Sequence, residues 1–296
     1  MAMGRTVQAQ SSPLPSSALS YLDSRGHWRE FWNAAAPPVS WTKTPLGSAA
    51  AWQKGAAELQ WAEISLRGSG EAWRTRLVVA RANPSRVRMR LDTAFSHARE
   101  AAWTLAKVDP KAILAINAGQ FEATMPWGIV VLDGRRWLPA QSGPLAAVFG
   151  QDSSGTLRWM IGAAATSSPS VAGLRWAFES YPVVVADDTV PAMLRSSGAP
   201  LDVAHRDARA GLCTTKDGTL LLAITRFDVA GASLSRIPFG LTVPEMAGVM
   251  GALGCRNAML LDGGISARLR IRDSRGVAHD WEGLRSVPMG LVMFPR

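Results

Sequence analysis

The sequence of 296 residues has only five lysines, two cysteines and no long uncharged apolar run. No window approaches the roughly 20 apolar residues of a membrane-spanning helix, so we expect no transmembrane segment. The N-terminus lacks the apolar core of a complete signal peptide, although residues 6–12, TVQAQSS, resemble the small-residue end of a cleavage site. Two cysteines cannot form a metal site by themselves. Cys213 and Cys255 therefore form either one disulfide in an exported protein or two buried thiols.

The charge is unbalanced toward arginine. Lys and Arg total 32 against 23 acidic residues, which gives a net charge of +9, and only five of the 32 are lysine. Such an excess is typical of nucleic-acid binders. The arginines are scattered, however, and form no basic run or known nucleic-acid motif. Anionic substrates such as phosphates or acidic polysaccharides fit the charge as well, so we expect no nucleic-acid partner.

The first 57 residues are rich in Ser, Pro and Ala and show no periodicity. This composition predicts a flexible N-terminal arm over residues 1–57, which Trp28, Trp32 and Trp41 could pin to the body. From about residue 58 the pattern changes to short alternating or apolar runs bounded by Gly and Pro, which predict strands. No internal repeat or clear linker follows, so residues 58–296 are predicted to form one domain.

Strands are predicted at 59–66, 75–82, 87–94, 112–119, 181–188, 258–261 and 286–294, with β-hairpins at 128–138, 145–162 and 211–225. Residues 87–94 alternate apolar and basic side chains, which predicts a strand with one face in water. Helices are predicted over 96–108 and 241–254, the second with a capping box formed by Thr242 and Glu245. We therefore predict an α+β fold, a single domain built on a large mixed, mostly antiparallel sheet with flanking helices.

Three of the predicted strands end in polar or glycine-rich segments, which are Asn117-Ala118-Gly119, Asp187-Asp188 and Asp262-Gly263-Gly264. If these strands are neighbours, the polar side chains gather along one rim, where glycines let backbone approach a ligand and free N–H groups for anions. The alternative is that each segment is an ordinary turn. The paired acids could also hold a divalent cation, although adjacent residues of a strand point to opposite faces.

Five segments, in this order, resemble the phosphodiester glycosidase family: AINAGQF, GIVVLDG, ARAGLCTTKDGTLLLAITR, TVPEMAGVMGALGCRNAMLLDGGISARL and RSVPMGLVMFP. The resemblance covers residues 58–296. It implies a bacterial hydrolase that cleaves a glycosyl phosphodiester, or a related cell-envelope or exopolysaccharide glycan, without a cofactor. It also implies an extracytoplasmic location, either periplasmic or secreted.

Carried over by position, the family pattern implies a substrate site formed by Asn117, Gly119, Arg209, Gly263, Gly264, Ser266 and Arg285. Two positions depart from it. Gln120 stands where an aromatic is common, which removes a stacking surface for a sugar ring. Ile265 replaces a third glycine, which adds bulk where backbone would approach the ligand. These departures support an alternative function, a non-catalytic carbohydrate-binding or polysaccharide biosynthesis or export accessory protein.

Cleavage of a sugar-1-phosphodiester at the anomeric carbon passes through an oxocarbenium-like transition state and releases a phosphate that is already a good leaving group. The reaction therefore needs a carboxylate near the anomeric carbon, to assist water or to attack. Asp262 is the first candidate, with Glu122 and Asp228 as alternatives. Arg209 and Arg285 suit the phosphate, because guanidinium pairs with it bidentately.

Two further residues are weaker candidates. His205 lies four residues before Arg209 and is more simply a loop residue than an acid or base. Trp127, just after the Asn-Ala-Gly segment, is the tryptophan best placed to stack on a sugar.

Overall fold

The computed structural model describes residues 17–34, 45–95, 103–141, 143–162, 171–195, 201–229 and 234–296. About half of the structure is strand, 48% against 14% helix. In the described ranges the α-helices are α1 (Pro45–Ala49) and α3 (Val243–Ala252). Neither is long and apolar enough to cross a membrane. The fold is therefore mostly β rather than the balanced α+β predicted from the sequence, while the predicted large, mostly antiparallel sheet with a flanking helix is found.

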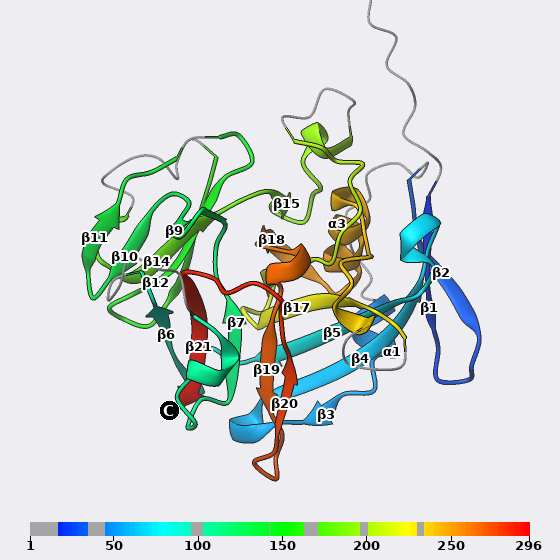
Figure 1. The fold of residues 1–296 in the computed structure, drawn as a ribbon, viewed down its shortest axis with the longest axis horizontal. Coiled ribbons are helices and arrows are strands. Elements are labelled where there is room, and N and C mark those ends of the chain that lie inside the picture. Colours follow the sequence, from blue (N-terminus) through cyan, green and yellow to red (C-terminus); the bar gives the residue numbers. More distant parts are fainter. Residues whose placement is uncertain are drawn as a thin grey trace, which may run out of the picture.

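The largest sheet has nine strands and curls into a half-barrel (Figure 1). Its strands, in spatial order, are β15 (Val183–Val185), β18 (Cys255–Leu261), β16 (Ala210–Thr215), β17 (Leu220–Phe227), β5 (Thr75–Ala82), β4 (Gln60–Arg67), β1 (Ala18–Leu22) and β2 (Trp28–Asn33), and β3 (Gln53–Lys54) pairs with β4. The pairings within it are antiparallel. This sheet contains the strands predicted near residues 60, 75 and 183 and the hairpin predicted at 211–225.

Two five-stranded sheets pack against one face of the large sheet. One is β11 (Arg135–Leu138), β10 (Val130–Leu132), β14 (Leu174–Ser180), β12 (Ala147–Asp152) and β13 (Leu157–Ile161). The other is β20 (Ala278–Trp281), β19 (Leu269–Arg272), β7 (Leu114–Asn117), β21 (Met289–Pro295) and β6 (Val87–Thr93). Side chains from all three sheets fill one continuous apolar core. The single large sheet that we predicted is therefore three sheets.

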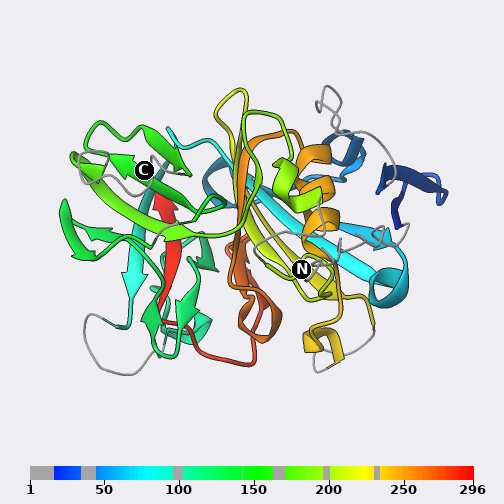
Figure 2. The ribbon, with the colours of Figure 1, turned by 90° about the horizontal axis from the view of Figure 1, so that it is seen from above.

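Helix α3 covers the opposite face of the large sheet, where its apolar side chains pack with those of β4, β5 and β18. Figure 2 shows this helix and the N-terminal hairpin on one side of the molecule and the two smaller sheets on the other. A two-stranded ribbon, β8 (Phe121–Glu122) with β9 (Met125–Pro126), follows β7. The short 3₁₀ turns are η1 (Ala56–Glu58), η2 (Gly70–Trp73), η3 (Leu105–Lys107), η5 (Ala192–Arg195), η6 (Leu234–Arg236) and η7 (Gly264–Ser266).

The helix predicted over 96–108 is not found in the described part of that segment. Residues 96–102 lie outside the described ranges, and the rest is not an α-helix. Trp103 instead pairs with Val287 through two backbone hydrogen bonds of 2.9 and 3.2 Å, and only the turn η3 follows. The apolar spacing that resembles a helix serves a small buried cluster against β21. Tertiary packing has overridden local periodicity here.

The N-terminal segment also differs, where it is described, from the flexible arm that its composition predicts. Strands β1 and β2 form a hairpin on the edge of the large sheet, and Leu19 is fully buried. The ring of Trp32 lies against α3, where a Cβ on Gly248 would come within 2.3 Å of it. Trp41 lies outside the described residues. The domain boundary at residue 57 stays a prediction.

Helix α3 begins as the sequence predicts. Thr242 Oγ1 accepts a hydrogen bond of 3.2 Å from the Glu245 backbone, and the Glu245 carboxylate accepts one of 2.9 Å from the Thr242 backbone. Glu245 is fully buried, and Arg206 donates to both of its carboxylate oxygens at 2.6 and 2.8 Å. This ion pair ties the loop before β16 to the start of the helix.

Cys213 of β16 and Cys255 of β18 form a disulfide between adjacent strands, and both residues are fully buried. The structure therefore contains the disulfide rather than two buried thiols.

Removing the disulfide with Cys213→Ala and Cys255→Ala is expected to lower the free energy of unfolding by about 2–4 kcal/mol, because the bond closes a long loop in the unfolded chain. The two cysteines are 42 residues apart. Urea denaturation with and without reductant measures the effect. Equal midpoints for the oxidised wild type and the double variant would contradict the prediction, and reductant should not change the variant further.

Candidate functional site

Strand ends from two sheets bring the candidate site together. Arg209 lies directly before β16 and Asp262 directly after β18, and these strands are antiparallel neighbours with Ala210 opposite Leu261. Asn117 ends β7 in the other sheet. The two sheets meet where the Asp262 backbone donates a 2.9 Å hydrogen bond to the carbonyl of Gly119. The predicted convergence of Asn117 and Asp262 is therefore found.

The side-chain amide of Asn117 joins the two ends of the loop between β18 and β19. Its Nδ2 donates to the carbonyl of Asp262 at 2.8 Å, and its Oδ1 accepts from the backbone of Arg268 at 3.0 Å. Asn117 is 1% exposed. Because the amide is used on both sides, Asn117 holds the loop in place and is not presented to a sugar. Gly119 follows with a φ of +68°, a conformation that favours glycine.

The glycines after Asp262 pack against a neighbouring loop. A Cβ on Gly263 would lie 2.4 Å from the carbonyl of Ala208, and one on Gly264 would lie 2.7 Å from the Asp207 carboxylate. Gly264 also has a φ of +55°, and its N–H donates to the Ala208 carbonyl at 2.6 Å. The close approach that the sequence predicted for a ligand is thus made by the chain's own residues, the backbone of Ala208 and the carboxylate of Asp207.

Asp262 is the carboxylate at the centre of this arrangement. Burial, with a smaller contribution from the nearby negative charge of Asp207, raises its pKa from 3.8 to about 6. A hydrogen bond from Ser266 and the charges of Arg285 and Arg268 oppose that shift. An acid whose pKa lies near neutrality can exchange protons at physiological pH, as general acids and bases do.

Asp207 is a second carboxylate of the site that sequence reasoning missed. Burial raises its pKa, which the charge of Arg209 opposes. Its carboxylate accepts from the Ala208 backbone at 2.8 Å and lies 3.8 Å from His205 Nε2. In sequence it stands among charged residues that look like a solvated loop. Its only signal is its position two residues before the family arginine.

Arg285 and Arg209 differ sharply in how free their guanidinium groups are to bind an anion. Arg285 is exposed, with its guanidinium 4.6 Å from the centre of the Phe121 ring and 3.3 Å from the Ala123 carbonyl. The guanidinium of Arg209 is instead mostly committed to the protein, because it donates to the carbonyls of Leu241 and His205. Arg285 is therefore the better placed of the two for an incoming anion.

Two buried arginines lie beneath the loop. Arg268 is 1% exposed and donates to the carbonyls of Ser266 and Trp103, while its Nη2 has no partner among the described residues. Arg226 is 4% exposed, donates to the carbonyl of Ala267 at 2.6 Å, and burial lowers its pKa to about 10. Neither forms an ion pair with a carboxylate within the described chain. They make the base of the site electropositive.

Several predicted site residues do not join this group. The Asp228 carboxylate pairs with Arg76 of β5, and Glu122 is exposed on the β8–β9 ribbon. Asp187 and Asp188 lie at the other end of β18, because β15 runs antiparallel to it. There they pair with Arg256 and Lys216. The prediction that all three strand ends share one rim is wrong for these two acids. Among the described residues, no group of three or more metal-binding side chains is found.

The structure shows the surroundings of Gln120 and Ile265, the two departures from the family pattern. Gln120 donates to the Tyr181 carbonyl at 2.9 Å, and the rings of Tyr181 and Trp127 are 4.6 Å apart between centres. An aromatic pair therefore stands beside the position that lacks one. Ile265 is 42% exposed, so its side chain points to water, while its carbonyl accepts from the backbones of Leu284 and Arg285.

A model of the phosphodiester glycosidase family matches residues 110–294. No protein with a curated description matches the sequence. Similar folds occur in solved structures that share 16% of their residues with this chain. The catalytic domain of zebrafish N-acetylglucosamine-1-phosphodiester alpha-N-acetylglucosaminidase, auto-inhibited by pro-peptide, has a TM-score of 0.58 over 83% of this chain and 88% of its own.

Two bacterial structures are also similar, again with 16% identity. A protein of Burkholderia pseudomallei K96243 described as exported has a TM-score of 0.55 over 94% of this chain and 86% of its own. A hypothetical protein from Synechocystis has a TM-score of 0.52 over 96% of this chain and 69% of its own. At this level of identity these likenesses establish the fold alone.

The raised pKa of Asp262 predicts a pH-dependent cost to folding. Folding favours the protonated acid, so this stability is fully present below pH 3.8 and is lost as pH rises from there through about 6. The loss amounts to about 3 kcal/mol. Asp262→Asn should therefore raise the urea midpoint at neutral pH and leave it nearly unchanged near pH 4. Glu122→Gln, at an exposed acid, is the matched control. A midpoint for Asp262→Asn that equals wild type at both pH values would contradict the prediction.

Proposed function

Because the chain belongs to the phosphodiester glycosidase family, we propose that it is a hydrolase that cleaves a glycosyl phosphodiester at the rim between β16, β18 and β7. The observation that carries this proposal is the setting of Asp262. A half-buried carboxylate with a pKa of about 6 stands beside an exposed arginine at a preorganised glycine loop. This combination suits a reaction in which positive charge develops at a sugar carbon and negative charge leaves with a phosphate.

Asp262 acts at the anomeric carbon in this scheme. At neutral pH a carboxyl with a pKa of about 6 is mostly ionised, so it can accept a proton. Water adds its oxygen to the anomeric carbon while Asp262 takes the proton. The bond from that carbon to the phosphate oxygen breaks, and its electron pair leaves with the phosphate. The leaving phosphate already carries charge, so it needs little protonation.

Arg285 is the residue we assign to the phosphate. It is exposed and held at the mouth of the site by the Phe121 ring and the Ala123 carbonyl. Its positive charge also lowers the pKa of Asp262. Arg209 is half-buried in the loop, and its charge opposes the rise in the pKa of Asp207. Its role is therefore to position that loop. The buried Arg226 and Arg268 add positive potential below the anion without contacting it.

Asp207 acts as a positioning residue. Its carboxylate packs against Gly264, and its negative charge raises the pKa of Asp262. Removing that charge would make Asp262 more acidic and a weaker base. On the sugar side, Trp127 and Tyr181 provide the aromatic surface, since aromatic faces pack well against sugar rings. This placement compensates for Gln120.

The substrate that we infer is a phosphodiester-linked sugar of the cell envelope or an exopolysaccharide, met outside the cytoplasm. The buried disulfide supports that location, because such bonds persist in oxidising compartments. The alternative is a protein of the same fold that binds such a glycan without cleaving it. Ile265 favours this alternative, because its exposed apolar side chain stands where the family pattern has glycine.

Asp262→Asn is expected to lower kcat by about 10²–10⁴-fold, because the carboxylate acts in the chemical step. The assay is phosphate-monoester release from a panel of sugar-1-phosphodiesters in both anomeric configurations. Glu122→Gln serves as the matched control and keeps most of the activity. Equal turnover by wild type and Asp262→Asn would refute the assignment. Binding to a glycan array without turnover of any diester would establish the non-catalytic alternative.

The acid limb of the kcat/KM profile of the wild type is expected near pH 6, where Asp262 ionises in the free enzyme. Asp207→Asn should move that limb to lower pH, because it removes a negative charge that opposes ionisation of Asp262. Arg285→Gln should move it to higher pH, because it removes a favourable positive charge. A limb that stays in place in both variants would show that Asp262 does not control it.

A further inference from the structure

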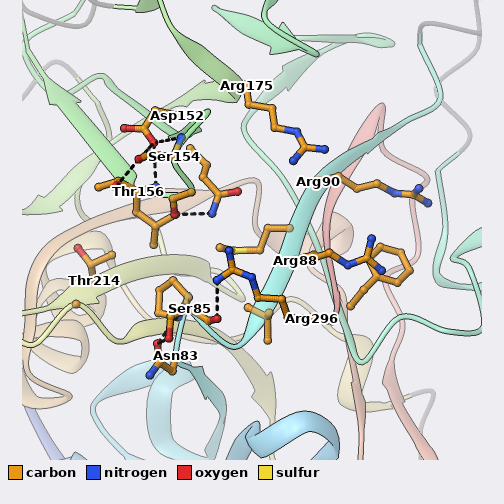
Figure 3. A pocket seen from close by; sticks show the side chains of 18 of the residues that line it. Asn83, Ser85, Arg88, Arg90, Asp152, Ser154, Thr156, Arg175, Thr214 and Arg296 are labelled. Atoms are coloured by element: carbon orange, nitrogen blue, oxygen red, sulfur yellow. Dashed lines mark hydrogen bonds between the residues drawn. The ribbon is translucent and has the colours of Figure 1, made fainter.

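A second concave surface lies at the opposite ends of the strands that carry the candidate site. It is a groove of about 1250 Å³ between the start of β6, the hairpin of β12 and β13, and the hairpin of β16 and β17 (Figure 3). The start of β18 and the end of β21 also line it. The site described above lies at the end of β18 and the start of β16, so the two surfaces do not share residues.

The groove is strongly cationic. Its acids are Asp109 and Asp152, and its basic side chains are Arg88, Arg90, Lys111, Arg175, Lys216, Arg256 and Arg296. Asp152 is already engaged with Arg158, outside the groove, at 2.8 Å. Lys216 and Arg256 pair with Asp188 and Asp187. The positive charge of the groove therefore exceeds the negative charge that lines it.

Four arginines of the groove have no acidic partner within the described ranges: Arg88, Arg90, Arg175 and Arg296. All four are exposed. Arg88 and Arg90 are two residues apart on the wet face of β6 that the alternating pattern predicted, and each stacks over Phe294, at 5.9 and 4.9 Å from its ring centre. Such stacking restricts the side chain and leaves guanidinium N–H groups to donate to an anion, although Arg88 Nε already donates to the Pro295 carbonyl at 3.2 Å.

The groove is longer than a single sugar needs. A second hollow of about 680 Å³ adjoins it and shares Asn83, Thr215 and Lys216 with it. Trp52 and Arg81 line this hollow together with two acids, Glu58 and Asp217. The guanidinium of Arg81 lies 4.0 Å from the centre of the Trp52 ring. Pockets for drug-sized ligands measure roughly 300–1,000 Å³. The groove exceeds that range, so it fits a chain of several units better than one small anion.

The lining chemistry favours a carbohydrate chain over a nucleic acid. Single-stranded nucleic acids bind on exposed aromatic faces, and neither aromatic ring of the main groove is fully exposed, since Trp159 is half-buried and Phe294 is buried. Phe294 is 8% exposed beneath its two arginines, and Trp159 packs on Phe149 while its Nε1 donates to Thr214. Hydroxyl and amide groups line the rest, including Asn83, Ser85, Ser154 and Thr156, as the labels in Figure 3 show. Such groups match sugar hydroxyls.

We propose that this groove binds a strand of anionic polysaccharide away from the candidate hydrolytic site. Arginines of β6 and β14 contact its negative groups, and the hydroxyl-lined wall of the β12–β13 hairpin contacts its sugars. The carbohydrate nature of the ligand is consistent with the proposed function, but binding in the groove does not require hydrolysis. A groove of this kind would keep a polymer attached while a phosphodiester is presented to the other end of the sheet.

The test is fluorescence polarisation binding of labelled dextran sulfate, alginate and neutral dextran to the full chain, at rising NaCl concentrations. Proteins with Asp262→Asn are used throughout, so that hydrolysis does not alter the probe. We expect binding to both anionic polymers and not to dextran, with affinity that falls as salt rises. The triple variant Arg88→Gln, Arg90→Gln, Arg175→Gln should lose about tenfold or more in affinity.

The matched control removes three arginines from the distant edge of the large sheet: Arg25→Gln, Arg29→Gln, Arg67→Gln. It has the same net charge as the groove variant and should bind like the parent protein. Equal losses in both triple variants, unchanged binding in the groove variant, or no binding of either anionic polymer would overturn the proposal. Tighter, groove-dependent binding of oligothymidylate would overturn it in favour of a nucleic-acid partner. The hydrolase assignment is tested separately, by the turnover assay with the wild-type protein, so its failure would not be confused with failure of the groove proposal.

Discussion

The buried amide of Asn117 is the contact on which the candidate site depends. It accepts from the backbone at one end of the β18–β19 loop and donates to the backbone at the other, so one side chain sets the path of seven residues. The loop crosses from the large sheet to a smaller one at this point. Without that amide, two buried backbone groups would lose their partners, and such losses are costly in a protein interior. Asp262 owes its position to this constraint.

Local signals in the sequence predicted the strands well and the layers poorly. Alternation and the Asp-Gly turns located the hairpins, and the capping box located α3, because these depend on neighbours in sequence. The number of sheets depends on which strands meet across the core, which no short window contains. The segment around Trp103 shows the limit most clearly, since its apolar spacing is helical while its backbone pairs with Val287. The N-terminal hairpin was missed for a related reason, because its partner strand lies some 45 residues later.

For the site, the family resemblance predicted where the residues lie better than it predicted what each residue does. It pointed to Asn117, Asp262 and Arg285, which do converge. It also implied that the glycines serve the ligand, whereas Gly263 and Gly264 are needed for contact with residues 207–208. Asp207 was missed because its importance comes from burial and from its neighbour Gly264, and neither is visible in a run of charged residues. The opposite ends of the same strands carry an arginine surface that no single motif marks.

Glu245 links two requirements that are usually separate in a protein. Its carboxylate closes the cap of α3 and also receives the fork of Arg206, which leads directly into the Asp207–Arg209 loop. Selection for a stable helix start and selection for a correctly placed loop therefore act on the same atoms. A drift from Glu to Gln, tolerated at most capping positions, would here leave a half-buried guanidinium without its counter-charge. Substitutions of Glu245 are thus constrained by the neighbouring loop as well as by the helix cap.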